Sequence, residues 1–263
     1  MKIFRQFRNK FIMENTKKYI LYALGEIFLI VLGILIALQI GKWNENKIRT
    51  AKEHSYLSAL KTDLNTQIKE LDILYDNDIL QCQNIETVMK KFSVLGEDHQ
   101  LDSIYPLINE LTNRYTFKSV NSTFTELNST GNLDLIHDSN LRSDILKYYQ
   151  YTSRIEKIVN SNNSNFVDDI YNKNLLPITL YSLDMMSSNF LDVVGITSIP
   201  NAFLPDEPLK QTSRTLISKE ENKLLLFNLI TRRYMVAKIQ TLFYAELKTK
   251  THDLLAQVNQ YIH

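Results

Sequence analysis

The chain has 263 residues, and its 30 Lys and Arg residues nearly balance 29 Asp and Glu residues, for a formal net charge of +1. This balance lacks the cationic excess with which nucleic-acid binders neutralise phosphate, so it argues against a nucleic-acid partner. The counts of 6 Gly and 5 Pro disfavour sandwiches and barrels built from many tight turns, and a single cysteine, Cys82, excludes an intramolecular disulfide.

Residues 1–18 form a basic N-terminal segment, with six Lys or Arg residues against one Glu and hence a local charge of +5. Positively charged flanks tend to stay on the cytoplasmic side of a membrane helix, so we expect this segment in the cytoplasm. Five further basic residues follow the apolar segment by residue 61. Because six basic residues precede the apolar segment and five follow it, their numbers alone hardly favour one orientation. We favour a cytoplasmic N-terminus because the opposite orientation requires export of a tail with a net charge of +5.

An apolar segment, YILYALGEIFLIVLGILIALQI, covers residues 19–40. At about 1.5 Å per residue, a helix of this length matches a hydrocarbon core of roughly 30 Å. No small-x-small cleavage site follows, which favours an uncleaved signal anchor over a signal peptide. We predict a transmembrane helix over residues 19–41, with Tyr19, Tyr22 and Trp43 as aromatic anchors at the two interfaces.

One face of this predicted helix combines an acidic residue with small residues. At about 100° per residue, a narrow stripe takes in Glu26, Ile30, Gly33, Ala37 and Gly41. Small residues at this spacing let helices approach closely, so the stripe predicts a packing face for a second copy or for a partner helix. Two alternatives stay open: Glu26 reaches the lipid headgroups, or it relays protons.

Residues 42–263 are predicted to form a helical soluble domain. A first helix continues toward Gly96 with apolar residues three and four apart, as in a bundle core or, less readily, an oligomeric coiled coil. Further helices are expected over 101–115, over 123–129 with Gly131 as the stop, and over 141–171 with Asp138 as N-cap. The apolar residues of the first helix are Leu57, Leu60, Leu64, Ile68, Leu71 and Tyr75.

Residues 172–217 hold four of the five prolines and predict a crossing loop with a short helix near 188–194. Ser218 to Glu221 reads as a capping box that opens a final helix to Tyr261. The sequence thus predicts an all-α protein, in which the transmembrane helix continues into an elongated antiparallel helical bundle. The buried side of the final helix is expected to hold Leu224, Phe227, Ile230, Tyr234, Met235, Ala237, Leu242, Leu247, Leu254 and Val258.

Catalytic and metal-binding motifs do not emerge from the sequence. The five histidines are scattered without ligand spacing, and the chain lacks a nucleophile elbow, a phosphate-binding loop and a dinucleotide fingerprint. Tyr148, Tyr149 and Tyr151 suit core packing better than a binding groove, although both remain open. We expect no catalytic, cofactor-binding or metal-binding residues, and no cofactor.

Two stretches, YALGEIFLIVLGILIALQIGKWNE over 22–45 and ELNSTGNLDLIHDSNLRSDILKYY over 126–149, carry a resemblance. Together they resemble an uncharacterised family of short single-pass membrane proteins common in flavobacteria and other Bacteroidota. The resemblance covers the first 150 residues and implies an N-terminal span followed by a helical domain. It also implies a bacterial inner-membrane protein whose C-terminal domain faces the periplasm, and it supplies no catalytic residues.

Three functional hypotheses follow. The first is a membrane-anchored, non-enzymatic scaffold or accessory subunit of an envelope complex, whose partners are the bilayer and another envelope protein or a second copy. The second is a periplasmic ligand-sensing module that signals through a partner, because few residues remain on the other side of the membrane. The third is an enzyme whose site the sequence does not disclose.

Overall fold

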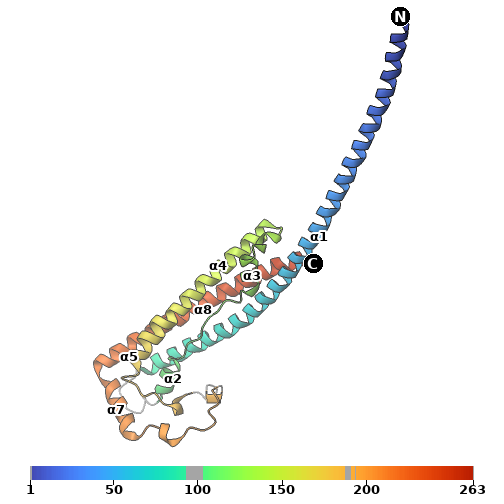
Figure 1. Cartoon of the computed structure of the whole chain (residues 1–263). Coiled ribbons are helices and arrows are strands. Elements are labelled where there is room, and N and C mark those ends of the chain that lie inside the picture. Colours follow the sequence, from blue (N-terminus) through green and yellow to red (C-terminus); the bar gives the residue numbers. More distant parts are fainter. Residues whose placement is uncertain (1, 93–102, 187–190, 193, 263) are drawn as a thin grey trace. The chain divides into compact units, whose positions relative to one another are not determined.

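The computed structural model describes residues 2–92, 103–186, 191–192 and 194–262, with the backbone alone for residues 2–18. The chain divides into two compact units, residues 1–55 and residues 56–263. Helix α1, Lys2–Phe92, contributes to both units (Figure 1). Each unit is described by itself below.

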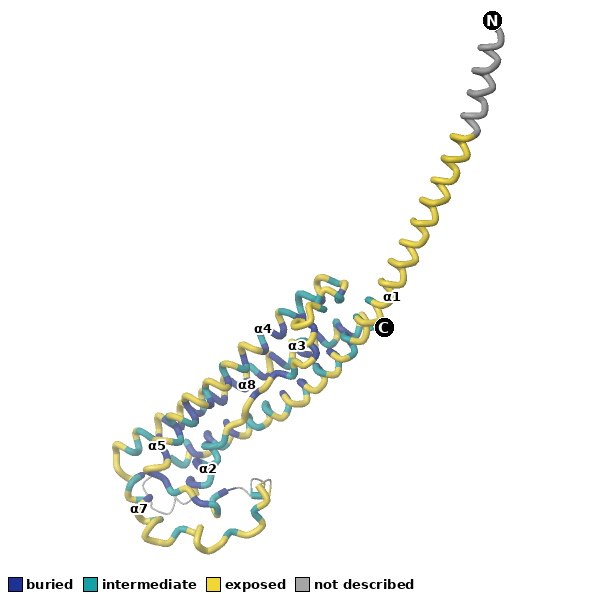
Figure 2. Tube along the Cα trace, in the orientation of Figure 1, coloured by how far each residue is buried: buried dark blue, intermediate teal, exposed yellow. Residues whose placement is uncertain are grey.

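In the first unit, every side chain from residue 19 to residue 48 is exposed (Figure 2). The exposed side chains include large apolar ones such as Leu21, Phe28 and Leu35. Among the described residues, one helix is long and apolar enough to cross a membrane, and it is the part of α1 from Tyr19 onward. Such a helix is consistent with a single-pass membrane anchor, because its apolar surface finds no partner within its own unit.

The second unit is an all-helical bundle built on three long pieces: residues 56–92 of α1, α4 (Ser139–Asn162) with its π-helical extension η3 (Asn163–Asn172), and α8 (Glu220–Ile262). Helix α8 runs antiparallel to the other two, as paired contacts show. Against α1, Phe227 meets Phe92 and Tyr234 meets Glu86. Against α4, Thr251 meets Tyr148 and Tyr261 meets Asp138 at the N-cap. The predicted all-α fold is confirmed, and α1 and α4 run parallel to each other.

A parallel pair of helices needs a connection that returns along the bundle, and residues 111–121 provide it. This segment, here called the strap, is largely extended and joins α2 (Tyr105–Glu110) at one end of the bundle to α3 (Ser122–Ser129) at the other (Figure 1). Shorter elements complete the unit: η2 (Asn132–Leu135), α5 (Lys173–Leu175), η4 (Leu183–Met185), η5 (Asn201–Phe203) and α7 (Glu207–Ser218).

The buried residues of the long helices recur with alternating spacings of three and four, the heptad pattern of helix packing. The predicted stripe of α1 is confirmed at four positions, while Ile68 and Tyr75 are only partly buried. In α8 the pattern is continuous over ten positions: Leu226, Ile230, Arg233, Ala237, Gln240, Tyr244, Leu247, Thr251, Leu254 and Val258.

That register corrects the expectation for α8. Four apolar residues expected inside are exposed, because they lie off the two heptad positions that face α1 and α4. The sequence offers apolar residues on both faces of this helix, and only contact with its neighbours selects the buried set. The exposed residues are Leu224, Phe227, Met235 and Leu242.

Several boundaries also differ from expectation. Helix α2 spans only Tyr105–Glu110 rather than 101–115, because the residues that follow belong to the strap. The prediction over 188–194 lies mostly outside the described residues. Helix α7 was missed in the stretch expected to be a loop, although Asp206 caps it by accepting a hydrogen bond from the Leu209 amide.

The capping box expected at Ser218 is wrong. Ser218 ends α7, and its hydroxyl donates to the Arg214 carbonyl 2.8 Å away, so it is not free to cap α8. Two other local predictions are confirmed. Gly131 follows α3 with a left-handed φ of 69°, and Asp138 caps α4 by accepting from the Asn140 and Leu141 amides.

Candidate functional site

A layer of buried polar side chains divides the bundle core. Apolar clusters lie on either side, one containing Leu64, Ile145 and Leu247 and the other containing Ile85 and Ile230. All members of the layer are buried, and they occupy helix positions that continue the apolar heptads. We call this the central polar layer: Asp78 and Gln81 of α1, Asn163 at the start of η3, and Arg233 and Gln240 of α8.

Arg233 connects this layer to the strap. Its exposed fraction is 1 %, and its Nε donates to the Leu111 carbonyl at 3.1 Å while Nη2 donates to the Asn113 carbonyl at 2.9 Å. Leu111 is the C-cap of α2, where unpaired carbonyls favour a cation. The Arg233 guanidinium therefore caps the C-terminus of α2 and holds the first residues of the strap in place.

Other side chains hold the strap along its length. Asn163 donates to the Tyr115 carbonyl at 2.9 Å, and Gln67 accepts from the Val120 amide at 2.8 Å. Glu156 accepts from the Ser119 amide at 3.2 Å. Because an extended segment outside a sheet has no backbone partner of its own, these helix side chains satisfy it instead.

Burial shifts the pKa values of the two charged residues in the layer, Asp78 and Arg233, toward their neutral forms. Burial raises the pKa of Asp78 to about 7, although nearby Arg233 opposes the shift. Burial likewise lowers the pKa of Arg233. Within the described part of the chain, Asp78 Oδ2, Gln81 Oε1 and Arg233 Nη1 make no hydrogen bond. Asp78 is thus a buried carboxyl that can take up a proton near neutral pH.

At one end of the bundle, two residues of the stretch 126–149, Glu126 and Asn132, bind α1. The Tyr56 hydroxyl donates to Glu126 and accepts from Asn132, both at 3.0 Å. Asp63 accepts from the Thr123 amide at 2.9 Å and so caps the first turn of α3 from a neighbouring helix. The stretch over 126–149 therefore has a packing role at this end.

Cys82, Tyr148 and Tyr149 lie in the core, and for the two tyrosines this agrees with the expected core packing. Cys82 is buried and its thiol pKa is raised, chiefly by burial. Tyr148 and Tyr149 are buried, whereas Tyr151 is partly exposed with its pKa raised to about 12, first by burial. Among the described residues, no three His, Cys, Asp or Glu side chains lie close enough together to hold a metal ion.

The residues of the predicted membrane helix are not buried by any other part of their own unit that the structure describes. Glu26, Ile30, Gly33, Ala37 and Gly41 are all exposed. A Cβ added at Gly33 or Gly41 would meet no atom within 4 Å. The predicted anchors are exposed as well: Tyr19 by 76 %, Tyr22 by 83 % and Trp43 by 67 %. Their packing and anchoring roles stay predictions.

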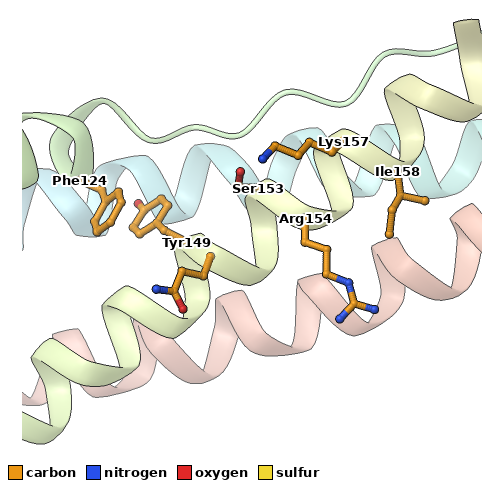
Figure 3. Close-up of a pocket in the computed structure, with 7 residues that line it drawn as sticks. Phe124, Tyr149, Ser153, Arg154, Lys157 and Ile158 are labelled. Carbon is orange, nitrogen blue, oxygen red and sulfur yellow. The ribbon is translucent and has the colours of Figure 1, made fainter.

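A groove of about 590 Å³ lies along α4. Phe124 and Tyr149 form its aromatic end, with their rings stacked at a centroid distance of 4.3 Å. Arg154 and Lys157 lie farther along the helix, with Ile158 beyond them, as Figure 3 shows. Aromatic faces next to cations suit a planar anionic ligand.

Sequence reasoning missed the central polar layer because it followed apolar residues alone. A signal was nevertheless present in α1, where Gln67, Asp78 and Gln81 occur at the three-and-four spacing set by Leu57, Leu60 and Leu64. Continuing that spacing through the polar positions would have placed all three in the core.

Comparison with known proteins adds a family. Residues 26–202, about two thirds of the chain, match a family of unknown function, DUF6090. Neither a curated protein nor a solved structure matches the chain. The match begins within the apolar segment and includes α4 with the strap that precedes it. The chain therefore belongs to the family of unknown function DUF6090.

Proposed function

We propose that this protein is a single-pass membrane protein whose helical bundle serves as a non-enzymatic scaffold or accessory subunit of a bacterial envelope complex. Residues 1–18 lie in the cytoplasm, residues 19–41 cross the inner membrane, and residues 42–263 face the periplasm. The observation that carries this proposal is the unbroken run of exposed side chains from residue 19 to residue 48, which only lipid or another protein can cover.

The bundle supports a structural role. Its strap and helices are joined by buried hydrogen bonds from Arg233 and Asn163, which hold one arrangement of the backbone. A rigid body on an anchor presents constant faces to a partner. The stripe of Glu26, Gly33, Ala37 and Gly41 offers a further contact inside the membrane, since no described atom occupies the space beside its glycines.

Purification of the full-length chain in mild detergent, followed by crosslinking, tests the proposal. We expect an oligomer or a co-purifying envelope protein, and a monomer without a partner contradicts the scaffold role. Gly33→Leu should reduce this assembly, because leucine blocks close helix approach. Gly25→Leu is a matched control, since Gly25 is equally open but lies off the stripe.

Glu26→Gln separates the packing role of the stripe from proton relay. An amide keeps hydrogen-bonding capacity, so assembly should persist with little change. Loss of a cellular phenotype with assembly intact would instead favour the relay.

Topology needs an added thiol, because Cys82 is buried. In a Cys82→Ala background, Asn160→Cys on the exposed face of α4 should react with a membrane-impermeant maleimide in intact spheroplasts. Asn9→Cys in the basic tail should react only after lysis. The reverse pattern would place the bundle in the cytoplasm.

A ligand-sensing module is the second candidate, favoured by the groove along α4. A bound anionic metabolite should raise the Tm of the full-length chain by mass action. Lys157→Glu should abolish that shift, whereas Lys147→Glu, on α4 outside this groove, should retain it. A broad metabolite panel without a shift would remove this candidate.

A further inference from the structure

Where the apolar segment of α1 ends, one side of the helix carries a row of polar and aromatic side chains. At about 100° per residue, the spacing of these side chains places all of them within roughly 100° of arc. All of them are exposed. We call this set the donor face: Gln39, Trp43, Asn46, Lys47 and Thr50.

Every member of the donor face can donate a hydrogen bond. Gln39 and Asn46 carry amide groups, Trp43 an indole N–H, Lys47 an ammonium and Thr50 a hydroxyl. Among the residues that the structure describes, none accepts a hydrogen bond from these five side chains. A row of donors that includes a cation suits an anionic acceptor with several oxygen atoms.

The charge of the donor face lies close to the end of the apolar segment. Side chains of a helix lean toward its N-terminus, which here means toward the apolar residues. Lys47 shows this, since its Nζ lies over the Trp43 ring, 5.7 Å from the centroid. Trp43 is about 5 Å beyond Ile40 along the axis, and the headgroup layer on each side of a bilayer is about 5–7 Å thick. The ammonium is therefore at headgroup level.

We infer that the donor face binds the phosphate group of an anionic phospholipid in the leaflet that meets Trp43. This inference rests on the proposed function, because it requires residues 19–41 to cross the membrane. It adds a preferred lipid to the bilayer as a partner. It does not depend on the stripe of small residues within the membrane helix.

The acidic residues nearby do not neutralise the donor face. Glu45 lies about 160° from Lys47 around the helix. Lys42 and Arg49, three and four positions from Glu45, outweigh its charge. Glu53 lies about 9 Å beyond Lys47 along the axis, farther from the apolar segment. The donor face and its surroundings thus carry a net positive charge at headgroup level.

This arrangement favours an anionic lipid over a zwitterionic one. The headgroup of a zwitterionic lipid adds an ammonium beside the phosphate, and that ammonium needs an acid or an aromatic ring. The nearest acid, Glu45, lies on another side of the helix. Lys47 already covers one face of the Trp43 ring. An anionic headgroup brings no ammonium, so its phosphate meets the donor face without a competing repulsion.

Fluorescence of Trp43 tests the inference, because Trp43 is the single tryptophan of the chain. The full-length chain is reconstituted into vesicles of phosphatidylcholine that contain one fifth phosphatidylglycerol. Brominated acyl chains, which quench tryptophan, are carried either by the phosphatidylglycerol or by an equal mole fraction of the phosphatidylcholine. Quenching by the anionic lipid should correspond to at least threefold enrichment beside Trp43. Added salt should reduce the enrichment, because it screens the charges.

Two matched substitutions separate the donor face from general attraction of charge. Lys47→Glu should abolish the enrichment while the helical circular dichroism spectrum is unchanged. Lys52→Glu makes the same change of charge at an exposed position about 140° away around the helix, and it should retain the enrichment. Equal losses in the two variants would overturn the inference, because charge alone would then explain the enrichment.

The wild-type measurement also separates this inference from the proposed function. Equal quenching by the two brominated lipids overturns the lipid preference and leaves the membrane anchor and the scaffold proposal standing. Absence of quenching by either lipid removes the anchor as well, because Trp43 would then not lie at a membrane.

Discussion

Residues 19–48 and residues 56–92 belong to the same helix and place their apolar side chains in opposite ways. In the first stretch the apolar residues surround the helix and all are exposed. In the second they recur at three and four residues, and Leu57, Leu60 and Leu64 are buried against the rest of the chain. A helix that is apolar on all sides needs lipid, whereas one apolar stripe needs only neighbouring helices.

The two stretches of α1 also differ in where their acidic residues lie. Glu26 lies exposed among apolar neighbours, whereas Asp78 lies buried within the central polar layer. In the bundle, buried polar groups are used to hold the strap. We therefore expect the stability of the bundle to depend on specific polar positions as well as on apolar burial, and neither to matter in the first stretch.

The largest effect is expected at Arg233. Arg233→Met keeps much of the side-chain volume but removes both hydrogen bonds to the strap, and each charge-assisted bond contributes about 1.5–3 kcal/mol. The free energy of unfolding should fall by about 4 kcal/mol, measured by thermal circular dichroism in detergent.

Its neighbour provides the control. Arg232 is exposed, with its guanidinium 4.8 Å from the Phe166 ring centroid, and Arg232→Met should cost under about 1 kcal/mol. Equal effects at the two positions would mean that the buried hydrogen bonds to the strap do not stabilise the bundle.

Asp78 should make stability depend on pH. Its pKa is raised from 3.8 to about 7 in the folded protein, so between these values the folded state holds a proton that the unfolded chain releases. The contribution is complete below pH 3.8 and is lost as pH rises through 7, by at most about 4 kcal/mol.

Thermal unfolding between pH 5 and pH 8.5 should therefore show Tm falling toward the alkaline end. Asp78→Asn should flatten this part of the profile, because an amide does not titrate. Asp76→Asn, an exposed position two residues earlier, should leave it unchanged. A wild-type Tm that rises with pH would contradict the proposed protonation of Asp78.

A pair of leucine truncations compares the two stretches directly. Leu64→Ala leaves a cavity in the core and should destabilise the bundle by about 3 kcal/mol, lowering Tm by roughly 6–12 °C. Leu35→Ala removes the same atoms from a 54 % exposed side chain and should leave the bundle Tm unchanged. A matching loss at Leu35 would show that the first stretch stabilises the bundle.

The smallest expected effect compares two glycines. A Cβ at Gly131 or at Gly33 meets no atom within 4 Å, but Gly131 has a φ of +69°. Gly131→Ala should therefore cost about 1 kcal/mol of backbone strain, and Gly33→Ala none in bundle stability. Thermal unfolding of the two variants under the same conditions measures the difference, and equal Tm values would argue against a strained turn at residue 131.

Much of the helical layout could be predicted, because its signals are local. The apolar run after residue 18, the N-cap at Asp138 and the left-handed stop at Gly131 each depend on residues close in sequence. The Ser218 capping box failed for a local reason as well, since its hydroxyl bonds within the preceding helix. The Ser218 hydroxyl could cap the following helix or donate to a carbonyl of the preceding one, and the sequence does not show which of the two it does.

The all-α class, the apolar N-terminal helix and the approximate positions of the long bundle helices can be read from the amino-acid sequence, since each follows from periodicity and capping within a few turns. Tertiary structure alone decided which face of α8 is buried, where the strap runs, and that Arg233 and Asp78 share the core. The reason is that these features depend on residues far apart in the sequence, 37 to 53 positions for the contacts of Glu156, Asn163 and Gln67 with the strap and 122 for the contact of Arg233 with Leu111. Such contacts form only when whole helices pack.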